Sequence, residues 1–178
     1  MASNQTWEER LRKEMVNELR YDDEHHKTYD SPLLNDEGRE WYPSLLMDAA
    51  QNFDERQLAD ELINQELVAL SEPVGPDRTE SQVDRLRVEQ FARQEFSLLR
   101  ARAVCALACG TGQKSVEIYR AEALPNPSPA VQNLLHTPME ASAFLTKLRR
   151  SRSLEAALGL PDDSRSGLGV RIPEDTNG

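Results

Sequence analysis

Two cysteines are the first candidates for metal ligands in this sequence. Cys105 and Cys109 stand four positions apart, the spacing of two metal ligands on adjacent turns of one helix. A structural zinc site needs four ligands, and none of the three histidines stands at metal spacing from another ligand. We therefore interpret the cysteines as free, buried thiols that pack as small apolar side chains. Because two thiols on one helix rarely reach disulfide geometry, they also indicate a reducing compartment.

Two further segments have the composition of a ligand site but not its spacing. Residues 22–26 combine Asp, Glu and His, but neighbouring side chains point in different directions and no calcium-loop glycine follows, so we interpret them as a solvated charge run. Residues 110–115 resemble a phosphate loop, except that Gln113 stands where the glycine before the lysine belongs. That loop also follows a helix, whose negative end would face the phosphate. We expect a turn that ends a helix.

One basic cluster, residues 147–153, contains Arg149, Arg150 and Arg152. It is either the basic end of a helix, where cations offset the helix dipole, or a contact for an acidic partner or a nucleic-acid backbone. No aromatic residue is interleaved, so stacking on bases is not indicated. No GxSxG, HExxH or GxGxxG signature and no nucleophile–base arrangement is present. We expect no catalytic, cofactor-binding or metal-binding residues and no cofactor.

The composition describes a short, acidic chain. Its 178 residues are 38% hydrophobic and include 31 acidic and 21 basic side chains, a net charge of −10. This length fits one compact domain, with or without tails, and excludes a large multidomain enzyme. Residues 1–75 carry a net charge of −11 and residues 76–178 a net charge of +1. A protein that binds DNA over its whole surface is therefore not expected, since phosphate neutralisation needs a basic face.

Leucine outnumbers valine and isoleucine together by 23 to 12, which favours helices over sheets. Capping residues and apolar periodicity predict helices, the second starting near Tyr42 so that Pro43 falls in its first turn. The expected helices cover residues 7–20, 42–52, 55–70, 80–109 and 137–148, with a linker at 72–76 and a Thr79 cap. The first helix has a narrow apolar stripe of Trp7, Leu11, Met15 and Leu19, which suggests docking on another surface.

Residues 115–121 alternate apolar and polar and form the best strand of the chain. Val116, Ile118 and Tyr119 lie in this strand, which needs a partner because a lone strand is unstable. The partner is either the tail segment 168–172 or a strand of another chain. The proline-rich segment 124–129 is expected to be extended.

These elements predict a mainly α protein, a helical bundle with one long helix, a small β element and flexible N- and C-terminal arms. We divide it into an N-terminal docking helix and charged loop at 1–34, a helical core at 35–150 and a flexible tail at 151–178. No apolar run approaches the ~20 residues that span a bilayer, and the N-terminus is polar. Neither a membrane span nor a secretory signal is expected.

Four segments of the sequence carry a resemblance to other proteins. They are the run from Glu95 to Cys105, the expected strand Val116–Ala121, the proline segment and the run from Phe144 to Arg149. Together they resemble small uncharacterised proteins encoded among the structural genes of tailed phages and prophages. The likeness covers residues 89–150 and brings no catalytic residue with it. It implies a role in the virion or in its assembly, and so a location in the virion or the host cytoplasm.

The sequence therefore predicts a non-enzymatic structural or interaction protein, an accessory component of a phage particle head. Its expected partners are other structural proteins or further copies of itself. The residues expected to make these contacts are Trp7, Leu11, Met15, Val116, Ile118, Tyr119, Arg149, Arg150 and Arg152. The alternative is a regulatory adaptor that binds a protein or nucleic acid through Arg149–Arg152, and a small enzyme is the third hypothesis.

Overall fold

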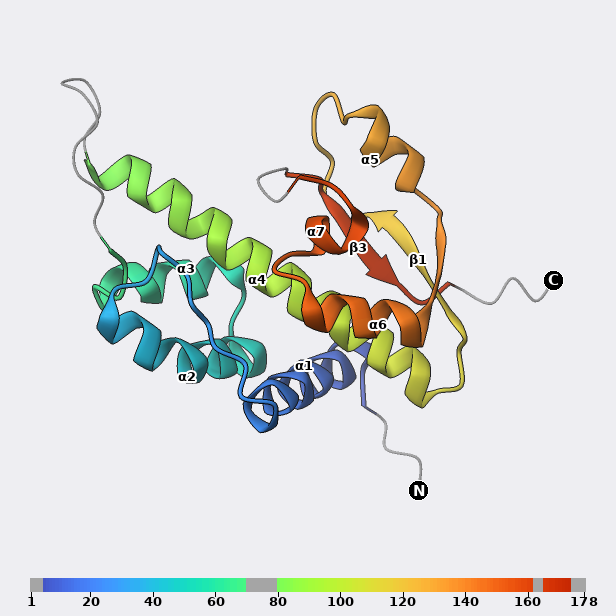
Figure 1. The fold of residues 1–178 in the computed structure, drawn as a ribbon, viewed down its shortest axis with the longest axis horizontal. Coiled ribbons are helices and arrows are strands. Elements are labelled where there is room, and N and C mark those ends of the chain that lie inside the picture. Colours follow the sequence, from blue (N-terminus) through green and yellow to red (C-terminus); the bar gives the residue numbers. More distant parts are fainter. Residues whose placement is uncertain (1–4, 70–79, 162–164, 174–178) are drawn as a thin grey trace. The chain divides into compact units, whose positions relative to one another are not determined.

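The computed structural model of the chain describes residues 5–69, 80–161 and 165–173. The fold is mainly helical, with one long helix and a small sheet (Figure 1), which confirms the predicted class. The helices are α1 (Trp7–Glu24), α2 (Asp36–Asn52), α3 (Glu55–Asn64), α4 (Glu80–Gly110), α5 (Pro129–Leu134), α6 (Ala141–Arg150) and α7 (Leu154–Leu158). The strands are β1 (Ser115–Arg120), β2 (Pro138–Glu140) and β3 (Leu168–Arg171). The predicted linker and the Thr79 cap lie outside the described residues.

The chain forms two compact units. The sheet unit contains Met1–Glu18 and Ser97–Gly178, and the helical unit contains Leu19–Phe96, so α1 and α4 each contribute to both. The helical unit has 19 acidic and 8 basic residues, a net charge of −11, whereas the sheet unit has 12 acidic and 13 basic residues, a net charge of +1. The acidity of the sequence therefore belongs to the helical unit.

In the sheet unit, three antiparallel strands follow the order β2-β1-β3. Val116 and Ile118 of β1 point into the core, and Ile118 lies opposite Val170 of β3. The tail segment therefore pairs with the predicted strand within the same chain, which settles the choice between the two partners left open by the sequence. Leu168 and Val170 are buried, so this part of the tail belongs to the core.

The helix predicted from Thr137 begins later, at Ala141. The backbone of Thr137 accepts a hydrogen bond from Ile118 N–H, and β2 follows it as an edge strand. Pro138 fits the first position of such a strand, where no backbone N–H is needed. The Glu140 carboxylate then caps α6 by accepting hydrogen bonds from the N–H groups of Ser142 and Ala143, which lie in the first turn and lack a partner within the helix.

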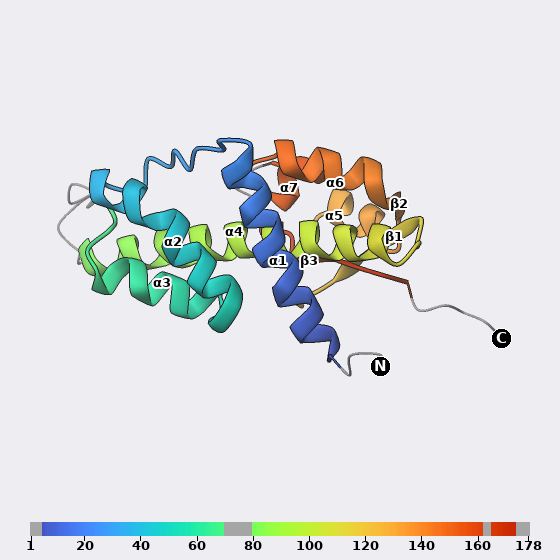
Figure 2. The same cartoon turned by 90° about the horizontal axis from the view of Figure 1, so that it is seen from below.

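The helical unit brings α2 and α3 beside the N-terminal half of α4, as Figures 1 and 2 show from two directions. The expectation that the second helix starts near Tyr42 is wrong, because α2 begins at Asp36 and runs through Pro43. Asn35 caps its first turn by accepting a hydrogen bond from Gly38 N–H at 2.7 Å. An interior proline costs ~3 kcal/mol, and burial of Tyr42, Leu45 and Leu46 at ~1.5–3 kcal/mol each offsets this cost.

The third helix has the predicted start but an earlier end. Asp54 and Gln57 form a capping box at its start. The helix ends at Asn64, and Glu66 follows with a φ of 55°, the left-handed conformation that closes many helices. Beyond it, Val68 is buried in an antiparallel bridge with Leu34 instead of on a helix face. Apolar spacing alone could not distinguish these two ways of burying the segment.

Candidate functional site

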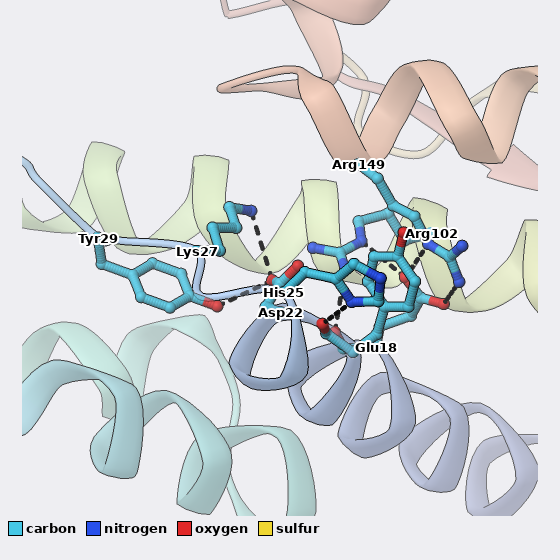
Figure 3. Close-up of polar contacts among 8 residues, drawn as sticks. Glu18, Asp22, His25, Lys27, Tyr29, Arg102 and Arg149 are labelled. Carbon is cyan, nitrogen blue, oxygen red and sulfur yellow. Dashed lines mark hydrogen bonds and ion pairs between the residues drawn. The ribbon is translucent and has the colours of Figure 1, made fainter.

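A polar cluster in the sheet unit joins α1, α4 and α6 through Glu18, Arg102 and Arg149 (Figure 3). Arg102 Nε donates to Glu18 Oε2 at 2.8 Å, and its Nη2 donates to the Glu18 backbone carbonyl at 3.0 Å. Arg149 Nε also donates to Glu18 Oε2, at 3.0 Å, and its Nη2 donates to Oε1 at 2.7 Å. One carboxylate thus holds two guanidinium groups, one of them through a bidentate pair.

Burial makes this triad a structural element of the core. The side chains of Glu18 and Arg102 are each 2% exposed, so neither charge is solvated by bulk water. Removing one partner would leave an uncompensated buried charge, which is far more costly than the net worth of an exposed ion pair. The sequence contained a signal that we missed: Glu18 follows Met15 by three positions, and thus lies along the apolar stripe of the first helix.

The triad uses one arginine of the basic cluster that the sequence predicted as an interaction site. Arg149 is committed to Glu18 and is 26% exposed, whereas Lys147, Arg150 and Arg152 are exposed. The basic residues in the last turn of α6 also lie where they offset the helix dipole. Any contact with an acidic partner would therefore use the three exposed cations.

The apolar residues predicted as contacts are mostly covered within the chain. Leu11 and Met15 of α1 are buried, as are Val116 and Ile118 of β1. Trp7, at the start of α1, is 44% exposed. The stripe of the first helix is therefore used mainly for packing, and its tryptophan is the part still open to solvent.

The outer face of the sheet holds a second polar cluster, centred on Glu117 of β1. Its Oε1 lies 2.6 Å from His136 Nδ1 and accepts a hydrogen bond from Arg171 Nη2 of β3 at 3.1 Å. The hydrogen bond from Arg171, followed by that from His136, lowers the pKa of Glu117. On the same face, the guanidinium of Arg171 lies 5.4 Å from the Tyr119 ring centroid. These contacts link the neighbouring strands across the solvent-facing side.

The sequence segments first considered for ligand chemistry adopt structural roles. Gly112 has a φ of 79° and ends α4 in the expected turn. Cys105 is buried, as expected, and burial is the main cause that raises the pKa of its thiol to about 12. Cys109 is exposed, contrary to the prediction of two buried thiols. Asp22 is also not solvated: it is buried, and it accepts a hydrogen bond from the Tyr29 hydroxyl at 2.9 Å.

No known protein family, curated protein or solved structure matches this chain. Across the described residues, no group of three or more His, Cys, Asp or Glu side chains is arranged to hold a metal ion. No helix in the described part of the chain is both long and apolar enough to cross a membrane. The functional argument therefore depends on the residues' own geometry.

Proposed function

We propose that this chain is a non-enzymatic structural or interaction protein, and that it serves as an accessory component of a tailed-phage head. The phage assignment is supported by the sequence resemblance across residues 89–150. The more general role, binding other proteins or further copies of the chain, is supported by the large apolar side chains that the fold leaves exposed.

The observation that carries this proposal is the exposure of both tryptophans of the chain. Trp7 is 44% exposed and Trp41 is 53% exposed, and Leu86 adds a third large apolar side chain at 67%. A scattered exposed leucine is ordinary, whereas tryptophan is enriched at the centre of protein interfaces. Its large ring buries much area when a partner covers it. Two exposed tryptophans are therefore typical of a contact surface.

Size-exclusion chromatography with light scattering tests the proposal on the full chain. We expect a defined oligomer, or recruitment into a complex with phage head or tail proteins. Replacing Trp7 or Trp41 by Ser should weaken that association, while replacement by Phe preserves most of it. A stable monomer at every concentration, with no affinity for head or tail proteins, would contradict the proposal.

The adaptor hypothesis is favoured by one observation, the exposure of Lys147, Arg150 and Arg152 around the end of α6. Three cations provide only a short basic surface, and binding through them should fall steeply as salt concentration rises. A monomer that binds nucleic acid in this salt-sensitive way, and loses binding in the Arg150→Gln/Arg152→Gln variant, would favour the adaptor.

A further inference from the structure

A groove of about 440 Å³ opens in the helical unit, between the end of α1, the loop that follows it and the middle of α2. Its apolar lining includes Leu19, Tyr29, Pro43 and Met47. Methionine adapts to differently shaped apolar ligands, and tyrosine offers a large rigid surface. The groove thus has the lining of a site for an apolar side chain.

On one wall of the groove, Lys27 and Tyr29 are held by contacts with the buried Asp22 (Figure 3). Asp22, at 3% exposure, accepts the Tyr29 hydroxyl at 2.9 Å and pairs with Lys27 Nζ at 3.4 Å. Directly before Lys27, His26 has a φ of 54°, and Lys27 N–H donates a hydrogen bond to the Asp22 carbonyl at 2.9 Å. This hydrogen bond closes the end of α1 and directs the loop back past it. The groove is therefore formed before any partner arrives, which lowers the cost of binding.

The opposite wall contains the interior proline of α2. Pro43 has no N–H, so the backbone carbonyl of Arg39 lacks its usual helical donor four residues later. Pro43 is exposed and lines the groove, so packing in the core does not explain why a proline stands at this position. A local feature that opposes helix stability is often found where a surface has another use.

Charge indicates the chemistry of the partner. Asp23 and Asp48 line the groove from α1 and α2, are exposed, and form no ion pair with any described residue. Lys27 is already paired with Asp22, which leaves Arg20 as the opposing cation among the described lining residues. The unit around the groove carries a net charge of −11. Basic side chains flanking an apolar one would complement this surface.

We propose that this groove binds a basic amphipathic helical segment of a partner protein. The segment places an apolar side chain against Pro43 and Met47, and its Lys or Arg residues approach Asp23 and Asp48. This mode is the familiar docking of a helix in a groove through anchors on one face. The inference rests on the proposed interaction function and assigns it a site and a partner chemistry.

The probe is a synthetic peptide of about 14 residues, made of leucine and lysine, with leucine at helical spacing. Its comparator has the same composition in an order that forms no apolar face. Binding to the full chain is measured by fluorescence anisotropy in about 0.15 M salt, which screens long-range attraction. The groove variant is Asp23→Lys/Asp48→Lys. The charge-matched control is Glu24→Lys/Glu40→Lys, which changes exposed acids of the same two helices outside the lining.

We expect the patterned peptide to bind at least about tenfold more tightly than its comparator. The groove variant should lose at least about tenfold in affinity, the control less than about threefold, and Met47→Gln should also weaken binding. Equal losses in the two double variants, or equal binding of the two peptides, would overturn the proposal in favour of general charge attraction. Chemical shifts that map the peptide away from Met47 would overturn the site but leave the interaction function standing, because that function is tested separately by light scattering.

Discussion

At the scale of single residues, Glu18 shows how a charged side chain can organise the core of the sheet unit. It accepts hydrogen bonds from guanidinium groups on α4 and α6, and those helices are far apart in the sequence. A buried ion pair is not stabilising merely because it exists, since desolvation offsets much of the attraction. Its role is specific: the two arginines require a carboxylate at this position and in this orientation.

Replacing Glu18 by Gln should destabilise the chain by about 3–5 kcal/mol, because Arg102 would remain buried without its counter-charge. Urea unfolding followed by circular dichroism measures the loss. The control is Glu14→Gln, which removes the same charge from a partly exposed position of α1 and should cost less than about 0.5 kcal/mol. Similar stabilities for the two variants would show that the triad contributes nothing particular.

The Glu117 cluster gives the chain a pH-dependent contact. The pKa of Glu117 is lowered in the folded state by its hydrogen bonds to Arg171 and His136. Its contribution to stability is therefore present above the unfolded-state pKa and is lost as the pH falls through the lowered folded-state pKa. Glu117→Gln should melt at a lower temperature than the parent at neutral pH, and the difference should vanish in acid. A difference that stays constant from neutral pH to well below pH 4.5, the ordinary value of the carboxyl group, would contradict this account.

At the scale of elements, the sequence predicted those whose signals are local. The α4 helix has no Gly or Pro between Glu80 and Cys109, and β1 has strict alternation, so both were predicted almost to their ends. The errors at Pro43 and Thr137 have a common cause. In each case a distant contact, the buried face of α2 or the backbone of Ile118, outweighs the local preference.

Pro43 allows a test of the balance in α2. The Pro43→Ala variant restores the backbone bond to the Arg39 carbonyl and removes the steric clash with the preceding turn. After allowing for the greater entropy of the unfolded chain, we expect a gain of about 2 kcal/mol and a higher melting temperature. The neighbouring Ser44→Ala variant is the control and should change stability by less than about 0.5 kcal/mol. An unchanged or lower melting temperature in Pro43→Ala would refute this account of α2.

The pairing of β3 with β1 makes a prediction about the end of the chain. Truncation after Gly167 removes the strand that places Val170 opposite Ile118 and exposes one side of β1. We expect a clear fall in melting temperature, since both side chains are buried in the intact chain and a two-strand remnant is marginally stable. A truncated chain that melts at the parent's temperature would show that the sheet does not depend on β3.

At the scale of the whole molecule, charge and architecture follow the same division. The sequence located the acidity before Pro76, whereas the structure assigns a net charge of −11 to Leu19–Phe96. Residues Met1–Glu18 instead belong to the unit that begins again at Ser97. Composition along the chain cannot reveal this, because the grouping depends on contacts between distant segments such as Glu18 and Arg102. The same limit explains why the triad was not predicted.

The most direct test of the proposal that this chain works by binding other proteins is acrylamide quenching of its two tryptophans. Single-tryptophan variants, Trp7→Phe and Trp41→Phe, assign the signal to each site. In the dissociated chain we predict ready quenching of both tryptophans, since 44% and 53% of their surfaces are exposed. In the assembled form we predict protection of at least one of them. Equal quenching of both residues in the assembled and dissociated forms would contradict the account.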